Sequence, residues 1–363
     1  MANIELASAN QKKVWTAKRY DEYVRASGFK PFMGKDANKI IHVRYDLKNE
    51  RGDTINIPLF AKLKGEPKRG AQPIEGNEQG MANFHFPIAI DWVGEGVAVS
   101  NADQFRTEID LLDAGKAGLV SFMGEVTRND IIDALNSKNG VKFADASAGV
   151  KNAWAAAHKD RVLFGSKTSN YNANFTTALG ALSAAEDVLS KRVVQLARYV
   201  ARNASRIVRP AVVEERKGMS GQGGNIVECY VMFVGARSFF HLKQDAELKE
   251  DLRHAMDRGV NNPLFQPDDL MIDNVVIREI PEISERCVIA GAGSAGVDVE
   301  PYFLCGAQAV GYAIGQDPKF TTDARDYGHI NGVAVRELRG IEKTRFDGLD
   351  HGVVTGYVAA PGA

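Results

Sequence analysis

A long, charged loop between two runs of alternating residues is the feature that most restricts how this chain can fold. The loop, Lys64–Gly80, contains four glycines and two prolines in KGEPKRGAQPIEGNEQG. Unstructured connections longer than about 12 to 15 residues are uncommon in compact domains unless they are functional. Apolar residues alternate before the loop, in residues 55–63, and after it, in residues 84–90, which is typical of β-strands. Because such a β excursion cannot bury much of itself within its own subunit, we expect it to contact a neighbouring subunit.

A further alternating run precedes this excursion. In KIIHVRYDL the odd-numbered residues from Ile41 to Leu47 are apolar or aromatic, which predicts a half-buried strand. Because the polar turn NERGD separates this run from residues 55–63, we predict that the two pair as a hairpin. Proline lacks the amide hydrogen that a central strand must donate, so Pro58 predicts an edge position for the second strand.

Two segments are predicted to be helical. The first covers Ser100–Lys138, where the apolar residues Phe105, Ile109 and Leu112 are spaced for one helix face. We expect an interruption around the glycines of AGKAG and a new helix start at the capping signal TRND. The apolar stripe of Thr176–Ile207 follows three-four spacing and predicts the strongest helix of the chain.

The second helical segment is also basic. Between Val188 and Arg209 it carries six lysines and arginines and no acid. The commoner meaning of such a run is a solvated face paired with acids elsewhere, and the alternative is a face turned toward an anion. The candidate stripe consists of Arg198, Arg202 and Arg206.

Beyond Pro210, short strands and helices alternate. The apolar runs IVECYVMFVG and NVVIREI predict buried strands, and a helix is predicted from about Ser238 to Asp257. A glycine-punctuated tail follows Asp317.

Composition indicates a soluble globular protein, with 44% apolar and 25% charged residues among 363. A formal net charge of −1 argues against a chain built chiefly to coat nucleic acid or an anionic membrane. The three cysteines are far apart, so we expect them reduced and in the core. No apolar run has the length of a signal peptide or a spanning helix, which predicts synthesis in the cytoplasm and no membrane association.

The stretch CVIAGAGSAGVDVE matches the dinucleotide fingerprint G-x-G-x-x-G at Gly291, Gly293 and Gly296. That fingerprint needs a helix directly after the glycines, because the helix N-terminus binds the pyrophosphate. Here VDVEPYF alternates like a strand and Pro301 would disrupt a helix under way. We therefore interpret the stretch as a surface loop and predict no cofactor.

Other catalytic or metal-binding patterns are also lacking in the sequence. The seven histidines are scattered without ligand spacing, and Ser220 in GMSGQGG lacks the setting of a nucleophile elbow. We predict no enzyme activity, no catalytic residues and no metal site.

Several features in order resemble the major capsid proteins of tailed phages with the Hong Kong 97-like fold, most closely a group of podophage coat proteins. The similarity covers about Trp15 to Gly315. It is carried by a polar arm, EGNE in the β excursion, a long helix, Arg209-Pro210 before YVMFV, NPLF at Asn262–Phe265, and LCGAQAVGYAIG at Leu304–Gly315. Each feature alone is a weak signal, and their order makes the case.

The resemblance implies an α+β fold of the Hong Kong 97-like phage capsid class, with an N-terminal arm, an extended β loop, a long spine helix, and peripheral and axial domains. The implied boundaries are residues 1–39 for the arm, 40–91 for the extended β loop, 92–206 for the peripheral domain with the spine helix, 207–316 for the axial domain, and 317–363 for a C-terminal segment returning to the peripheral domain. The implied inter-subunit contacts are Trp15, Tyr20, Lys62, Lys64, Lys68, Arg69, Glu75 and Glu78.

The expected function is that of a major capsid protein, which self-assembles into hexamers and pentamers of an icosahedral head. The arginine stripe would then face the interior or a neighbour. Expected partners are the chain itself, scaffold and portal proteins, a decoration protein as a further candidate, and non-specifically packaged double-stranded DNA. The expected location is the virion, after assembly in the host cytoplasm. An encapsulin-like compartment shell and, at low odds, a nucleotide-binding oxidoreductase are the alternatives.

Overall fold

The computed structural model divides the chain into two compact units. It describes residues 28–46, 52–60, 63, 66–70, 74–75, 78, 80–107, 109–216, 225–250 and 269–362. Among these, unit 1 comprises Trp92–Thr127 and Gln316–Leu338, and unit 2 comprises the remainder. Helix α2 (Leu111–Asn136) and strands β12 (Val310–Arg325) and β13 (Ile330–Lys343) contribute residues to both units.

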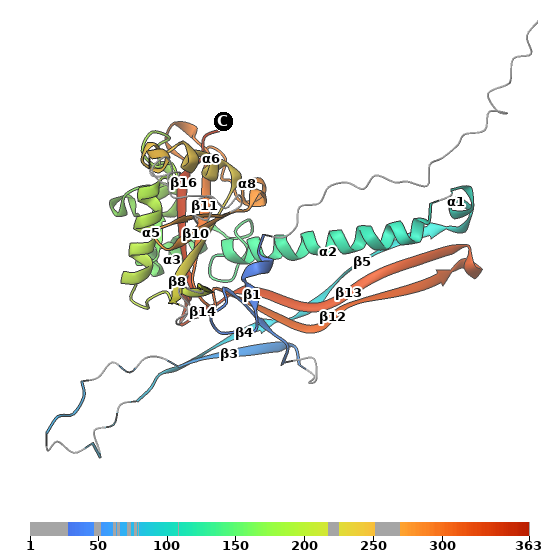
Figure 1. The fold of residues 1–363 in the computed structure, drawn as a ribbon, viewed down its shortest axis with the longest axis horizontal. Helices are drawn as coiled ribbons and strands as arrows, with labels where there is room; N and C mark the ends of the chain where they lie inside the picture. The colour runs from blue at the N-terminus through green and yellow to red at the C-terminus, as the bar shows by residue number, and fades with distance from the viewer. Residues whose placement is uncertain are drawn as a thin grey trace, which may run out of the picture. The chain divides into compact units, whose positions relative to one another are not determined.

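Unit 2 is built around a seven-stranded sheet (Figure 1). In spatial order its strands are β6 (Val162–Phe164), β16 (Val353–Ala359), β11 (Val299–Cys305), β8 (Asn225–Val234), β10 (Val275–Glu279) and β9 (Asp269–Ile272), with β7 (Ala211–Arg216) also paired to β8. All side chains of β11 and β16 are buried. Both faces of these strands are therefore covered, which is why their sequences are almost continuously apolar. β8 and β10 confirm the two strands predicted from IVECYVMFVG and NVVIREI.

Helices cover this sheet. They are α3 (Ala148–Ala157), α4 (Phe175–Gly180), α5 (Lys191–Asn203), α6 (Ala236–Gln244) and α8 (Pro281–Arg286). Single turns of 3₁₀ helix add η2 (Lys30–Phe32), η4 (Thr168–Asn170) and η6 (Ser294–Gly296). Val193 and Ala197 of α5 are completely buried and pack in one apolar cluster with Met232 and Val234 of β8. None of the helices that the structure describes is long and apolar enough to cross a membrane.

The predicted continuous helix over Thr176–Ile207 is wrong, because α4 ends at Gly180 and α5 begins only at Lys191. Between them the buried carboxylate of Asp187 accepts hydrogen bonds from the amides of Ser183 (3.0 Å) and Ser166 (2.9 Å). The bond with Ser183 is local, and such side-chain to backbone bonds compete with helix hydrogen bonding. Two helices therefore replace the one predicted, although the apolar Leu182, Leu189 and Val193 are all buried as expected.

The predicted helix over Ser238–Asp257 is also interrupted. α6 ends at Gln244, and the amide of Asp245 donates to the carbonyl of Leu242 at 3.2 Å. The Asp245 carboxylate then accepts from the amide of Glu247 at 3.1 Å, so a new helical segment starts there. Residues 251–257 lie outside the described part of the chain.

Unit 1 consists of a helix on three strands that belong to a five-stranded sheet. In that sheet these strands have the order β12-β13-β5, where β5 is Asp91–Ser100, and the turn η7 (Asp326–Gly328) joins β12 to β13. Leu119 and Met123 of α2 pack against Val333 and Val335 of β13. A short helix, α1 (Asn101–Arg106), connects β5 to α2.

The break in the Ser100–Lys138 segment falls elsewhere than predicted. It lies at residues 107–110, and α2 then continues through AGKAG and TRND. Asp110 starts α2, since its carboxylate accepts from the amides of Leu112 (3.0 Å) and Asp113 (3.1 Å). Gly115 lies within the helix. A Cβ there would lie 3.3 Å from the Val97 side chain, so glycine allows the helix to approach β5 closely.

The predicted hairpin between residues 40–48 and 55–63 is wrong. β2 (Ile41–Arg44) instead pairs in parallel with β1 (Met33–Gly34) and with the start of β12. β3 (Thr54–Phe60) pairs with β4 (Asn83–Ala89) across the long loop. The two-stranded β3–β4 sheet leaves β3 at an edge, as Pro58 predicted.

The region after Asp317, predicted only as a glycine-punctuated tail, is mostly β-structure. It contains half of β12, all of β13 and β16, and a small hairpin of β14 (Arg345–Phe346) and β15 (Leu349–Asp350). Its glycines serve turns and close approaches: Gly352 has φ of 119°, and a Cβ there would lie 2.7 Å from the carbonyl oxygen of Ala307.

Candidate assembly surfaces

The base of the β3–β4 hairpin is anchored in the core of unit 2. Ile57 lies opposite Phe86 and Ile55 opposite Ile88. All four are buried, in a cluster that also contains Phe346 of β14. The alternation that predicted the strands is therefore used to bury one face of the hairpin.

Burial ends toward the tip of this hairpin. Phe60 is 59% exposed, Ile74 is 71% exposed and Met81 is 53% exposed. Clustered exposed apolar side chains are characteristic of interaction surfaces. The described part of the loop therefore has the character of a surface that a partner covers.

The charged residues predicted to make contacts between subunits fall partly on this loop. Lys68, Arg69, Glu75 and Glu78 are all exposed in the structure. Trp15, Tyr20, Lys62 and Lys64 lie outside the described residues.

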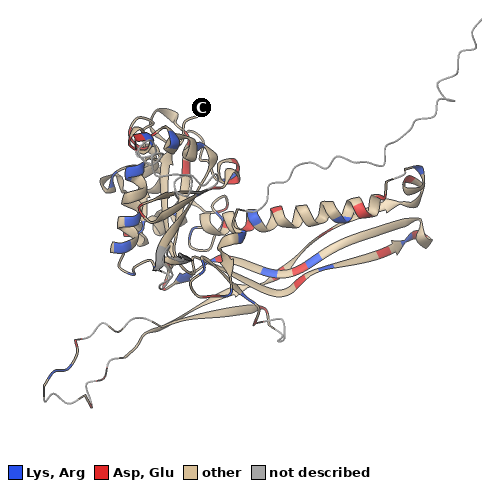
Figure 2. Cartoon of the chain, viewed as in Figure 1, with Lys and Arg blue, Asp and Glu red and all other residues tan. Residues whose placement is uncertain are grey.

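The three arginines of the predicted stripe do not share one helix face. Arg198 lies on α5 and pairs with Asp273. Arg206 lies beyond the end of the helix, where its guanidinium donates to the Asp347 carboxylate at 2.9 Å and stacks 4.7 Å from the Phe84 ring centroid. Of these three arginines, only Arg202 is exposed on the helix. Figure 2 shows basic residues along α5, and two of the three predicted arginines are neutralised within the chain.

A shallow hollow of about 450 Å³ adjoins the same helix. Its lining combines Phe164, Tyr171 and Tyr199 with polar groups such as Lys159 and Asn203. Tyr199 is 63% exposed. Exposed aromatic and polar groups side by side are features of contact surfaces.

The glycine-rich stretch is a loop, as interpreted from the sequence. The amide of Gly291 donates to the Asp298 carboxylate at 3.0 Å, and the amide of Ser294 donates to the Leu182 carbonyl at 2.8 Å. β11 follows the turn η6 directly, so no helix N-terminus faces the glycines. The backbone donors that a pyrophosphate would need are thus bonded within the chain.

The acid that ends this stretch is also structural. Glu300 is completely buried and accepts hydrogen bonds from the Ser238 amide at 2.8 Å and from the hydroxyls of Ser238 and Ser284. Its carboxylate thus lies at the N-terminus of α6, where a negative charge is favoured by the helix dipole.

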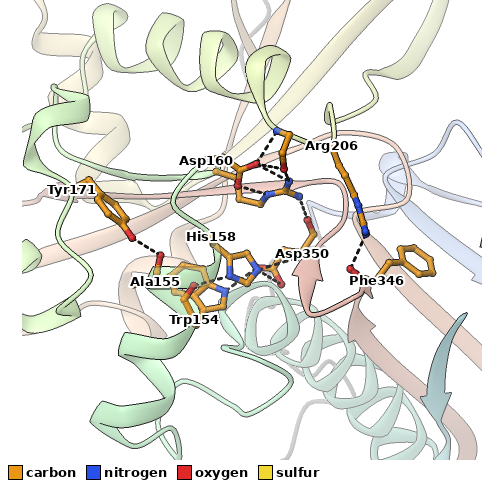
Figure 3. Close-up of polar contacts among 10 residues, drawn as sticks. Trp154, Ala155, His158, Asp160, Tyr171, Arg206, Phe346 and Asp350 are labelled. Carbon is orange, nitrogen blue, oxygen red and sulfur yellow. Dashed lines mark hydrogen bonds and ion pairs between the residues drawn. The ribbon is translucent and has the colours of Figure 1, made fainter. Parts of the chain in front are cut away.

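A buried polar cluster was not expected from the sequence (Figure 3). Asp350 accepts hydrogen bonds from the Trp154 indole at 3.1 Å and from Lys343 at 2.7 Å. His158 donates from Nδ1 to the Trp154 carbonyl at 2.7 Å, while its Nε2 accepts from the Asp350 amide at 2.9 Å. Because Nε2 accepts a hydrogen, the ring is neutral in this arrangement. The His–Asp contact is fully buried, so it joins α3 to the β14–β15 hairpin and cannot meet a substrate.

Charges in this cluster compensate one another. Burial alone would raise the pKa of Asp350, but the charge of Lys343 holds that pKa well below its usual range. Lys138 is buried with its Nζ 4.0 Å from the Trp154 ring centroid. Burial, reinforced by the neighbouring Lys343, lowers the pKa of Lys138. The cluster is a stabilising element of unit 2.

A second acid nearby is held in the same way. Burial would raise the pKa of Asp160, yet hydrogen bonds from Arg161 and Ser205 hold it below its usual range. The Ser205 hydroxyl donates to Asp160 at 2.6 Å, which ties the segment after α5 to the end of α3. Among the described residues, no group of His, Cys, Asp and Glu could hold a metal ion.

Unit 1 exposes further aromatic surface. Trp92 is 52% exposed, and Phe122 and Phe320 are 43% and 42% exposed. Phe105, which the spacing predicted on a buried face, is 94% exposed because the break at residues 107–110 separates it from α2. The molecule therefore carries large uncovered apolar side chains in both units.

Comparison with known proteins decides what these surfaces belong to. Residues 3–361 match the family model described as "Phage capsid protein". The chain is 37% identical to the structure "Cyanophage Pam1 capsid asymmetric unit", with all of both chains covered and a TM-score of 0.88. The chain belongs to the phage capsid protein family.

Two further relatives agree with this assignment. The major capsid protein of Pseudomonas phage KPP25 is 27% identical over 382 residues, which cover 99% of this chain and 97% of the relative. The capsid of Ralstonia phage GP4 has the same fold, with a TM-score of 0.75 at 21% identity over 99% of each chain. The resemblance read from the sequence is thereby confirmed, as is the α+β Hong Kong 97-like fold.

The capsid protein is therefore a structural component of the virion and not an enzyme. As a subunit of the shell of a phage head, it associates with copies of itself. The exposed apolar residues of the β3–β4 loop and of unit 1 are consequently surfaces on a protein that functions in an assembly.

Proposed function

We propose that this capsid protein builds the icosahedral head of a tailed phage from hexamers and pentamers, around double-stranded DNA. The observation that carries the proposal is its similarity, over the full length of both chains, to a subunit of the Pam1 capsid. The exposed loop between β3 and β4 supports it, because loops that cannot be buried within one subunit gain their contacts on assembly.

The domain roles follow from the same resemblance. We assign residues 1–39 to an arm on neighbouring subunits, 40–91 to the extended loop and 92–206 to the peripheral domain with the spine helix, of which α2 is the best candidate. Residues 207–316 are assigned to the axial domain and 317–363 to a segment returning to the peripheral domain.

Specific residues are proposed to contact neighbouring subunits. These are the exposed Lys68, Arg69, Glu75 and Glu78, together with Trp15, Tyr20, Lys62 and Lys64. Of the arginine stripe, Arg202 has the exposure to face the interior or a neighbour. Arg198 and Arg206 have acidic partners within the chain and are weaker candidates.

Other partners are proposed on the same basis. A scaffold and a portal protein would guide assembly, and a decoration protein is a further candidate. Packaged DNA would be bound without sequence preference, because a chain of net charge −1 leaves most phosphates to counterions.

Negative-stain electron microscopy of the expressed protein, alone and with the other head proteins of its phage, tests the proposal. We expect closed shells tens of nanometres across. A variant in which residues 63–80 are replaced by Asn-Gly closes β3 and β4 with a tight turn. It should remain folded by circular dichroism and form no shells.

The proposal fails if the wild-type protein forms only small discrete particles under both conditions. If the shortened variant forms shells as readily as the wild type, assembly stands and the role of the loop is wrong.

A further inference from the structure

A groove lies between α5 and the turn η4 of unit 2. The hollow of about 450 Å³ described above adjoins a second hollow of about 390 Å³, and Thr168, Ser169 and Tyr199 line both. The positions of α5 that line the two hollows follow the three-four spacing of one helix face, at residues 192, 195, 196, 199, 200 and 203. We call the two hollows together the α5 groove.

The α5 groove lies along an edge strand. Val162, Leu163 and Phe164, which form β6, all line the larger hollow. β6 is the last strand of the seven-stranded sheet on its side, and it pairs only with β16 among the strands that the structure describes. Because successive side chains of a strand point to opposite faces, a hollow lined by three consecutive residues lies along the strand edge.

The backbone groups on this edge have no partner in the described part of the chain. Alternate residues of a strand direct their amides and carbonyls to one neighbour. The Arg161 carbonyl and the Gly165 amide bond to β16 at 3.2 Å and 2.8 Å, so the amides and carbonyls of Val162 and Phe164 point away from β16. No described residue bonds to these four groups. Such an edge is a template for an added strand.

The walls of the α5 groove carry aromatic and polar side chains. Tyr199 is 63% exposed, and Thr168 and Ser169 are also exposed. The Tyr171 ring is held in place, because its hydroxyl donates to the Ala155 carbonyl at 3.0 Å (Figure 3). The α5 groove therefore offers a ring that can cover apolar side chains and hydroxyls that can bond to polar ones.

Each hollow also carries a basic side chain. Lys159 lines the larger hollow, where its Nζ lies 5.8 Å from the Tyr171 ring centroid, and Arg192 lines the smaller one. Both are exposed, and neither forms an ion pair with a residue that the structure describes. Figure 2 shows the basic residues along α5.

The acidic residues at the α5 groove are already bonded within the chain. Glu186 accepts from Lys167 at 2.7 Å. Asp160 accepts from Arg161 at 3.1 Å and from the Ser205 hydroxyl at 2.6 Å. The charge that remains available to a ligand is therefore positive, with one basic side chain in each hollow.

We propose that the α5 groove binds an extended, acidic peptide segment of another protein, which adds a strand to β6 and places carboxylates beside Lys159 and Arg192. Charge complementarity favours an acidic ligand. A peptide supplies both amides and carbonyls to the β6 edge. Phosphate oxygens only accept hydrogen bonds, so a nucleic-acid backbone would leave the two carbonyls of that edge unpaired. The site lies within one chain, so binding does not depend on shell formation.

Fluorescence anisotropy with defined peptides tests the proposal on the full-length protein. The probe is a labelled nonapeptide with two glutamates at each end and alternating valine and threonine between them. We expect saturable binding that weakens with added salt. The same peptide with lysine in place of glutamate should not bind. N-methylation of one alternate set of backbone amides should weaken binding about tenfold, whereas methylation of the other set should have little effect, since only one set faces β6.

Two arginines of α5 provide matched variants. Arg192→Glu reverses a charge in the smaller hollow and should weaken binding of the acidic peptide about tenfold. Arg202→Glu reverses a charge on the same helix at an exposed residue that lines neither hollow, and it should weaken binding by less than about threefold. Both variants should unfold at the wild-type temperature, because both side chains are exposed.

Several results would overturn the proposal. The acidic peptide could fail to bind, the two N-methylated sets could bind equally, or Arg202→Glu could weaken binding as much as Arg192→Glu. Displacement of the peptide by oligothymidylate at equal charge would assign the α5 groove to nucleic acid. Binding to the unassembled protein and not to shells would show that a second copy of this chain covers the groove. If the protein forms no shells, the proposed function fails, and the peptide measurements still decide this inference.

Discussion

The two units of the capsid protein bury their apolar residues to very different extents. Unit 2 contains several clusters, and in the two largest the central strands β8 and β11 are buried from both sides. In unit 1 the only buried cluster among the described residues consists of Leu119, Met123, Val333 and Val335, with Val93 and Leu112 partly buried against it. Most of the remaining residues of β5 and of the outer part of β12 are exposed.

This difference indicates where each unit obtains its stability. Hydrophobic stabilisation is roughly proportional to the apolar area removed from water, and ordering the backbone costs free energy for every residue. Unit 2 buries four apolar clusters among the described residues. Unit 1 orders a long helix and a sheet around a small core, so we infer that neighbouring subunits supply a substantial part of its stability.

The largest effect is expected from Asp350→Ala in unit 2. The change leaves Lys343 buried without the carboxylate that compensates it, and breaking a buried ion pair typically costs about 3 to 5 kcal/mol. Urea unfolding of the unassembled protein should show this loss. Asp145→Ala, at an exposed position of the same unit, should change the free energy of unfolding by less than about 0.5 kcal/mol. Equal effects of the two variants would show that the buried cluster does not stabilise unit 2.

The next effect is expected from Leu119→Ala, which truncates a side chain of the unit 1 cluster that is only 2% exposed. Leucine to alanine changes in cores cost about 2 to 5 kcal/mol, and the lower end is expected in so thin a core. Hydrogen exchange should show faster exchange at residues 92–127 and 316–338, with unit 2 unchanged. A uniform acceleration in both units would mean that they unfold together, which would contradict the comparison.

Assembly should restore part of this loss. In shells, unit 1 of the Leu119→Ala variant is expected to exchange more slowly than in the unassembled protein, because binding to the folded state stabilises it. Identical exchange before and after assembly would refute the inference that neighbours stabilise unit 1.

The same contrast explains which parts of the fold could be predicted from the sequence. β8 and β10 could be predicted, because each contains a run of consecutive apolar residues that local composition records. The glycine-rich stretch could be recognised as a loop, because Pro301 and the alternation after Gly296 exclude a helix there. The family could be recognised because its signals occur in order along nearly the whole chain.

The strand pairing of β2 and the interruption of the helix before α5 could not be predicted from local composition. The alternation in β2 suits pairing with β3 as well as with β12, and only long-range contacts choose between them. The helix break before α5 depends on the Asp187 carboxylate meeting amides at Ser166 and Ser183, which is a tertiary event. The buried cluster joins Asp350 to Trp154 and Lys343, whose proximity no local pattern reveals.

Of the candidate surfaces, one could be found from the sequence and another could not. The β3–β4 loop could be found because its length and glycine content are local properties. Phe105 was assigned to a buried face because it fits the periodicity of α2, and only the break at Thr107–Asp110 turns it to solvent.

A smaller, pH-dependent effect is expected from His351 of unit 2. Burial, together with the charges of Arg161 and Arg206, lowers the pKa of His351 to about 4. An unfolded histidine titrates near 6.5. Between pH 6.5 and 4 the unfolded state therefore binds more protons than the folded state, and the free energy of unfolding decreases as the pH is lowered. The difference corresponds to about 3 kcal/mol for a fully buried ring, and we expect about 2 because His351 keeps some exposure.

Urea unfolding at pH 7, 5.5 and 4 measures this effect. His351→Gln should lose less stability on acidification than the wild type. The matched control is His329→Gln, in which an exposed histidine of unit 1 is replaced and the wild-type pH dependence should persist. If His351→Gln and the wild type lose stability in parallel, the assigned role of His351 is wrong.

The smallest effects are expected from two cation–π contacts, one in each unit. Arg206 of unit 2 stacks on Phe84 and also donates to the Phe346 carbonyl at 3.0 Å and to Asp347. Arg336 of unit 1 stacks 5.1 Å from the Trp92 ring centroid at an exposed position. A cation–π contact contributes about 0.5 to 1 kcal/mol when exposed, and a hydrogen bond adds about 1 kcal/mol.

In the unassembled protein we therefore expect Arg206→Ala to cost about 1 to 2 kcal/mol, measured by urea unfolding, and Arg336→Ala to cost about 0.5 kcal/mol, measured by hydrogen exchange of unit 1. Arg202→Ala, on the exposed face of α5, provides the control without such a contact. If Arg336→Ala costs as much as Arg206→Ala before assembly, unit 1 is more independently stable than its small core indicates.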